Sequence, residues 1–387
     1  MIKQYKLRFY NFKLVVLLLA ISTIGVLLVG SAMESLKSKQ LFGVICGMVI
    51  LLIVSLMDFS WILNFYWFIY GFNIIMLLGI RIFGSTAGGA TRWIDLGFIR
   101  FQPTELSKIL LILFFSKYFM LHEKDLSEWK TVGKAVGLLL IPLALIYNQP
   151  DLKNTITVVI LFCVMIYVAG LSYKIIGSVL LIAIPLIVIF LSIVVQPDQK
   201  LIKDYQRQRI MSFFYPENEE YSDDIQQQTN SITAIGSGQL TGKGLNNNEV
   251  LSANNGNFVS EIQTDFIFAV AGEELGFIGC LIIVILLLLI SVECIRNGLK
   301  SKDLSGKIIC TGVGTIVAFQ SFLNICVATG LMPNTGTPLP FVSYGLTSLW
   351  SLFIGMGLVI NVGLQQNAYS DAASKSLVYK GVERKDE

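Results

Sequence analysis

Long apolar runs separated by short polar segments make up most of this 387-residue chain. An apolar run of about 20 residues is long enough to cross the hydrocarbon core of a bilayer as a helix. The pattern predicts an all-α integral membrane protein of about ten transmembrane helices, forming a single polytopic domain over residues 1–387. A large extracellular loop, 196–264, joins helices 7 and 8. The predicted spans are 12–31, 40–57, 60–82, 103–121, 134–148, 153–170, 173–195, 265–293, 306–329 and 344–366.

The distribution of Lys and Arg predicts the orientation of these helices. Cytoplasmic loops carry an excess of Lys and Arg, and this chain shows that excess when both termini are placed inside. The glycine-rich and polar loops 83–102, 149–152, 196–264 and 330–343 then lie outside, so we expect the functional residues there. The fifth and sixth spans flank the polar hairpin 148–151, and they are candidates for half-helices around a site.

Composition agrees with a lipid environment and narrows the chemistry. Hydrophobic residues make up 54% of the chain and charged residues 14%, against about 25% charged in a typical soluble domain. The net charge of +3 does not suggest a nucleic-acid partner. The single histidine, His122, excludes a Ser-His-Asp triad and a multi-histidine metal site. The basic N-terminus and the apolar run after it favour an uncleaved first helix over a signal peptide.

Two outer segments carry charged residues at the predicted membrane surface. In 84–108, Arg92 and Trp93 are either part of an interfacial belt that anchors a re-entrant loop or a recognition site for a lipid phosphate. Further on, Glu105 and Lys108 lie three residues apart on one helix face and can form an ion pair. That pair either holds helices together or contacts substrate directly. Asp151 is expected to cap the sixth helix.

The large loop and the helix after it contain the remaining candidates. Arg209 lies near the start of the loop, and glycines surround Lys243 in a pattern that could cradle an oxyanion. Asp265 stands at the mouth of the eighth helix, either as its N-cap or as a general base or ligand of a divalent cation. Glu273 lies deeper in the same helix, where a carboxylate needs a partner.

The segment 330–345 contains three prolines and three glycines, which exclude a helix and predict a rigid external turn. Ser343 and Tyr344 end this turn, and we expect them to support the site. The six cysteines lack any CxxC spacing and are interpreted as packing residues.

Taken together, these blocks resemble the shape, elongation, division and sporulation (SEDS) family, whose members include RodA and FtsW. The matching stretches occur in the family's order. They are RWIDLGFIRFQPTELSK, QPDL, YQRQRI, AIGSGQLTGKG, TDFIFAVAGEELGFIG and GLMPNTGTPLPFVSYG. The loop around Lys243 resembles RodA more than FtsW. Two departures are Lys153, where the family often has glycine, and Leu346, where the family often reads SYGGSS.

The resemblance implies a peptidoglycan glycosyltransferase that polymerises lipid II at the outer face of the bacterial plasma membrane, working with a class B penicillin-binding protein. It implies that Asp265 is the essential aspartate of the family, and that Arg92 with Trp93 and Glu105 with Lys108 correspond to its RW pair and its outer-helix acid and lysine. We expect the substrate and its pyrophosphate to be bound by Arg92, Trp93, Glu105, Lys108, Arg209 and Lys243. The resemblance leaves open whether the enzyme uses a divalent cation, Mg²⁺ or Mn²⁺, with Asp265 as a ligand. Two alternatives remain: a lipid II flippase, and a scaffold without activity that only activates its transpeptidase.

Overall fold

The computed structural model describes residues 9–87, 90–95, 97, 100–149, 151–194, 196, 204–214, 222–246 and 262–383. The first half of the chain forms α1 (Phe12–Ala32), α2 (Glu34–Leu56), α3 (Phe59–Ile62), η2 (Leu63–Phe65), α4 (Tyr66–Phe83), β1 (Gly84–Ala87), β2 (Ala90–Asp95), β3 (Arg100–Phe101), α5 (Pro103–Leu121), η3 (Glu123–Asp125), α6 (Trp129–Tyr147) and α7 (Leu152–Val168). The second half forms α8 (Tyr173–Val194), α9 (Asp204–Phe214), α10 (Ser222–Ser237), α11 (Ile267–Lys300), α12 (Leu304–Ala328) and α13 (Leu346–Glu383).

The chain is a multi-pass membrane protein built from helices. In the part of the chain that the structure describes, seven helical stretches are long and apolar enough to cross a bilayer: α1, α2, α3 to α4, α6, α11, α12 and the first part of α13. The other predicted spans coincide with α5, α7 and α8. Since α5 carries three charged residues and α7 is only 17 residues long, the full count of ten stays a prediction. The single-domain organisation likewise stays a prediction.

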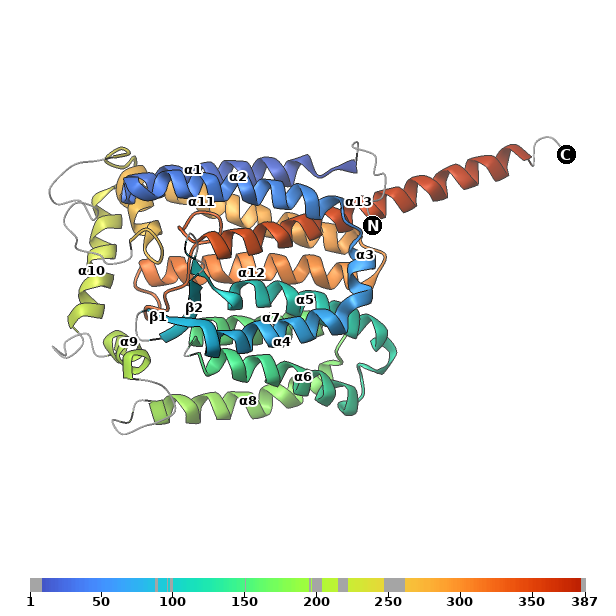
Figure 1. Cartoon of the computed structure of the whole chain (residues 1–387), viewed down its shortest axis with the longest axis horizontal. Coiled ribbons are helices and arrows are strands. Elements are labelled where there is room, and N and C mark those ends of the chain that lie inside the picture. The colour runs from blue at the N-terminus through green and yellow to red at the C-terminus, as the bar shows by residue number, and fades with distance from the viewer. Residues whose placement is uncertain are drawn as a thin grey trace.

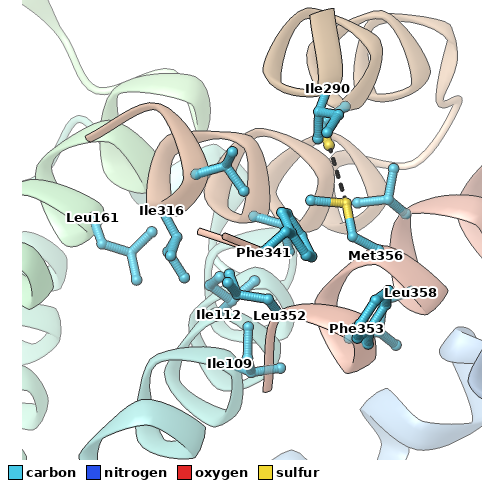
Figure 2. Packing of buried hydrophobic residues seen from close by; sticks show 14 of the residues in the cluster. Ile109, Ile112, Leu161, Ile290, Ile316, Phe341, Leu352, Phe353, Met356 and Leu358 are labelled. Carbon is cyan, nitrogen blue, oxygen red and sulfur yellow. Dashed lines mark hydrogen bonds between the residues drawn. The ribbon is translucent and has the colours of Figure 1, made fainter. Parts of the chain in front are cut away.

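The bundle presents apolar side chains outward as well as inward. Phe68 on α4 is 75% exposed and Leu288 on α11 is 60% exposed. In water such side chains would be costly, but a lipid-facing surface accommodates them. Inside the bundle, α5 packs against α4, α7, α12 and α13. Figure 2 shows the core between them, where Ile112 of α5, Ile316 of α12 and Leu352 of α13 lie close together.

One end of the bundle carries the irregular structure. The helices α9 and α10 and the strands β1 and β2 lie at the same end, whereas α13 extends beyond the opposite end (Figure 1). The loop 330–345, between α12 and α13, does not stay at the surface. Its residue Phe341 is buried and reaches the core shown in Figure 2. A Cβ at Gly25 of α1 would lie only 2.6 Å from the carbonyl oxygen of Phe341, so α1 can pack against this loop because it has glycine there.

Three sequence predictions need revision. The external loop expected at 83–102 contains a three-stranded antiparallel sheet of order β1-β2-β3. The loop expected at 196–264 contains the helices α9 and α10, which are too polar to stand out as apolar runs in the sequence. The fifth span is not a half-helix, since α6 has 19 residues, is apolar enough to cross a bilayer and begins at Trp129, ahead of the predicted boundary. For the sixth span, α7 with its 17 residues, the half-helix stays a prediction.

Candidate active site

Asp265 lies in the short segment that leads into α11. The helix begins at Ile267, the N-cap position is Phe266, and no side chain caps it. The N-cap interpretation of Asp265 was therefore wrong. This leaves the Asp265 carboxylate half-buried, and within the described part of the chain it makes no hydrogen bond or ion pair. A carboxylate with free lone pairs can accept a proton or bind a cation.

The main chain around Asp265 is held by groups from α12 and from the loop 330–345. Asn324 on α12 donates from Nδ2 to the carbonyl oxygens of Asp265 (2.8 Å) and Thr337 (2.7 Å). Ser343 Oγ donates to the carbonyl oxygen of Thr264 at 2.6 Å. These bonds fix the backbone of Asp265 and leave its side chain available, as expected for a preorganised catalytic group.

The end of the loop adds further support to the same segment. The backbone N–H of Tyr344 donates to the carbonyl oxygen of Gln263 at 2.9 Å. Ser343 Oγ also accepts a bond from the Leu339 backbone N–H at 2.7 Å, which ties the loop to itself. Ser343 and Tyr344 thus both contact the segment that carries Asp265, and their supporting role stays a prediction.

A turn at Gly336 brings Asp265 together with cationic side chains. Gly336 has φ +66°, and a Cβ there would lie 3.0 Å from Oδ2 of Asp265 and 3.5 Å from Nη1 of Arg209. Arg209 comes from α9, and Lys153, in the first turn of α7, donates from Nζ to the Gly336 carbonyl oxygen. Four separate parts of the chain therefore meet at one glycine.

Asp151, close to Lys153 in sequence, has a different environment. Its carboxylate is wholly buried and accepts hydrogen bonds from Gln102 Nε2 (3.1 Å), from Thr104 Oγ1 (3.4 Å), and from the backbone N (3.3 Å) and Nδ2 (2.8 Å) of Asn154. The predicted capping role on α7 is confirmed. Because these donors already occupy it, Asp151 is a structural acid, in contrast to Asp265.

The pair Glu105 and Lys108 extends this buried network. Lys108 Nζ donates to Glu105 Oε2 at 2.9 Å and to Asn154 Oδ1 at 3.2 Å. Both charged side chains are less than 5% exposed. This geometry favours the interpretation in which the pair holds α5 against α7, because a side chain so deeply buried and paired has little access to a bound phosphate.

In the glycine-rich loop around Lys243, the groups that could bind an anion already have partners within the protein. Inside α11, Gly276 has φ +66° and interrupts the helix. The N–H groups of Lys243 and Gly244 donate to the carbonyl oxygens of Glu273 and Glu274, both at 3.0 Å, and so satisfy groups freed by the break. The Lys243 side chain pairs with Glu273 at 3.0 Å. The loop therefore satisfies backbone groups that the break in α11 leaves free. Because its N–H groups are bonded in this way, the geometry does not favour an oxyanion-binding role for the loop.

Comparison with known proteins identifies the family of the chain. The family model described as Cell cycle protein, which represents FtsW, RodA and SpoVE, matches residues 4–368. The chain belongs to the SEDS family. Peptidoglycan glycosyltransferase MrdB of Escherichia coli (strain K12) is 35% identical over 298 residues, which are 76% of each chain. The probable peptidoglycan glycosyltransferase FtsW of Haemophilus influenzae is 34% identical over 298 residues, 76% of this chain and 72% of that protein.

Solved structures resemble this SEDS protein over nearly its whole length. A chain in a structure that concerns the coordination of polymerization and crosslinking by a peptidoglycan synthase complex aligns with a TM-score of 0.76 and 25% identity, covering 92% of this chain and 98% of that one. A variant of the rod shape determining protein RodA from Thermus thermophilus aligns with a TM-score of 0.64 and 25% identity, covering 92% and 97%. The expected SEDS membership is thereby confirmed.

The remaining predicted site residues of this SEDS chain lie on the sheet. Arg92 and Trp93 belong to β2, opposite β1, with Ser85 paired to Trp93. Both side chains are half-buried, and Nε of Arg92 is buried without a hydrogen-bond partner in the described part of the chain. A guanidinium with an unused buried donor is well suited to an anionic ligand. Arg92 is not on any of the elements that meet at Gly336.

Sequence reasoning missed three residues of this SEDS site. Gly336 was noted only as part of a rigid turn, Asn324 was hidden in an apolar helix, and Lys153 was noted only as a departure from the family pattern. The one available signal was a polar amide inside a membrane span, because such a group needs a partner. The contacts of Lys153 and Gly336 depend on long-range packing that spacing along the chain does not reveal.

Proposed function

We propose that this chain is a peptidoglycan glycosyltransferase that polymerises lipid II into glycan strands, with Asp265 at its catalytic centre. The proposal rests on the Asp265 carboxylate, which has no hydrogen-bond or ion-pair partner among the described residues and lies beside Arg209 at the Gly336 turn. The names of the relatives, peptidoglycan glycosyltransferase MrdB and FtsW, supply the reaction class.

The reaction needs two kinds of group in one place. A sugar hydroxyl of the acceptor attacks the anomeric carbon of the donor, and the lipid pyrophosphate leaves with the bonding electrons. Asp265 takes the proton of the attacking hydroxyl as general base. Arg209 stabilises the negative charge that grows on the departing pyrophosphate. Arg92, with its unused buried donor, is a second candidate for phosphate contact.

A divalent cation fits this site only in a limited way. Among the residues that the structure describes, no three His, Cys, Asp or Glu side chains cluster. Mg²⁺ often binds through one or two carboxylates together with substrate phosphates, so Asp265 with the substrate pyrophosphate would hold it. A bound cation would supply positive charge at the leaving group.

We further propose that both termini are cytoplasmic and that the end bearing α9, α10 and Asp265 faces outward, as the Lys and Arg distribution favours. The chain would sit in the bacterial plasma membrane among its lipids and take lipid II from the outer leaflet. Its partner would be a class B penicillin-binding protein, which cross-links the new glycan. The coarse resemblance to a chain in a peptidoglycan synthase complex supports this partnership.

The test is glycan synthesis from labelled lipid II by the purified chain with its transpeptidase partner, whose own active site is blocked. We expect a ladder of glycan chains from wild type, none from Asp265→Ala, and an unchanged ladder from Asp303→Asn. Asp303 is an exposed acid that precedes α12, at the far end of α11 from Asp265. If the folded wild-type complex makes no polymer but moves lipid II across vesicle membranes, the chain is a flippase. If it does neither and still activates its transpeptidase, it is a scaffold.

A further inference from the structure

Lys153 is a charged residue in the site that the SEDS pattern does not require. It lies in the first turn of α7, where the family often has glycine, and its side chain is half-buried. Nζ donates to the carbonyl oxygen of Gly336, the residue whose Cα lies close to the side chains of Asp265 and Arg209. The lysine therefore reaches the turn that organises the site from a different helix than Arg209.

The ammonium of Lys153 can donate more hydrogen bonds than the Gly336 carbonyl oxygen accepts from it. It can donate three hydrogen bonds, and Gly336 accepts one. No carboxylate in the described part of the chain lies within ion-pair distance of Nζ, and Glu105, which interacts with Lys153 through its charge, is already paired with Lys108. A half-buried cation without a counter-ion favours a site that an anion completes.

The charges at the Gly336 turn point to the class of that anion. Lys153 and Arg209 bring two cationic side chains to the turn beside Asp265. These cationic groups lie next to the proposed base, where the leaving group must be when the acceptor hydroxyl is activated. A pyrophosphate presents many acceptor oxygens at that place, and an ammonium binds phosphate as a point charge.

Resting on the proposed function, we propose that Lys153 binds the pyrophosphate of the lipid-linked donor, together with Arg209, while it holds the Gly336 turn in place. Relatives with glycine at this position would lack this contact. The chain would therefore bind lipid pyrophosphates more tightly than a variant carrying the family's glycine.

The test is equilibrium binding of fluorescent undecaprenyl pyrophosphate to the full chain in nanodiscs of neutral lipid, without turnover. The variants are Lys153→Gly, Lys153→Met and Lys153→Arg, and the control is Lys130→Gln, an exposed lysine at the start of α6. A charge-assisted bond predicts a loss of about 10- to 100-fold in affinity for the glycine and methionine variants. We expect near wild-type affinity for Lys153→Arg and for the control.

Two further measurements separate this contact from a purely structural clamp and from lipid effects. In Lys153→Met, undecaprenyl monophosphate should lose less affinity than the pyrophosphate, whereas loss of a purely structural clamp would weaken the binding of both lipids equally. Phosphatidylglycerol added to the nanodiscs should not compete with undecaprenyl pyrophosphate for the wild-type chain. A site that recognises anionic lipid headgroups in general would bind phosphatidylglycerol as well and would lose affinity for the pyrophosphate. Equal affinity of all variants for the pyrophosphate overturns the proposal, as does a Lys153→Arg variant as impaired as Lys153→Met. Because binding is read without catalysis, a wild type that fails to polymerise lipid II would sink the proposed function and leave this test intact.

Discussion

Replacing Gly336 with alanine should damage catalysis far more than folding. The residue has φ +66°, a conformation that costs an L-residue about 1–2 kcal/mol. The new Cβ would lie 3.0 Å from Oδ2 of Asp265, which is tighter than ordinary contact, and 3.5 Å from Nη1 of Arg209. Both side chains are half-buried at the site and can shift by a few tenths of an ångström.

That shift falls on the groups that the reaction depends on. Misplacing a catalytic group by about 1 Å can cost about 100-fold in rate, so we expect Gly336→Ala to lower kcat by about 10- to 100-fold. The assay is the initial rate of glycan synthesis from lipid II, with a thermal unfolding curve of the same preparation. The matched control is Gly345→Ala in the same loop, where the nearest atom to a new Cβ is 3.9 Å away. A Gly336→Ala enzyme with wild-type kcat would refute the placement of the site at this turn.

Two further predictions concern stability. Glu105→Gln and Lys108→Met should each lower the free energy of unfolding by about 3–5 kcal/mol, because each leaves one buried charge unpaired. The double variant, measured by unfolding in detergent, should lose less than the sum of the two single losses. A loss equal to that sum would argue against the pair. Gly242→Ala should destabilise the chain more than Gly244→Ala. Both glycines have positive φ, but only a Cβ at Gly242 would clash with the Glu274 carbonyl oxygen. Equal unfolding midpoints of the two variants would contradict the packing of this loop against the break in α11.

The sequence predicted the positions of the helices well because lipid imposes a strong constraint on them. A membrane-spanning helix must bury an apolar run of set length, and that run is visible in the sequence. Hydropathy gives no signal for α9 and α10, which lie outside the apolar runs, or for the sheet of β1 to β3, whose strands are short. The break at Gly276 was also invisible, since its freed backbone groups are satisfied by a loop more than 30 residues away.

The candidate site was predictable only in part. Asp265 was found from its motif, and Asp151 was expected to be a helix cap from its place before α7. The sequence does not show that the Asp151 carboxylate is filled by hydrogen bonds from Gln102, Thr104 and Asn154, because these donors lie in or next to two different helices. Gly336 and Lys153 gain their importance from a meeting of four chain segments, which no local pattern encodes.

The central claim is that Asp265 acts in the chemical step and not in binding the substrate. The most direct measurement is a single-turnover comparison of wild type and Asp265→Asn, each saturated with lipid II in complex with a blocked transpeptidase, with lipid II affinity measured on the same samples. The account predicts that the asparagine variant binds lipid II with wild-type affinity and forms glycosidic bonds at least about 100-fold more slowly, as for loss of a general base. Glycosidic bond formation at the wild-type rate in Asp265→Asn would contradict it.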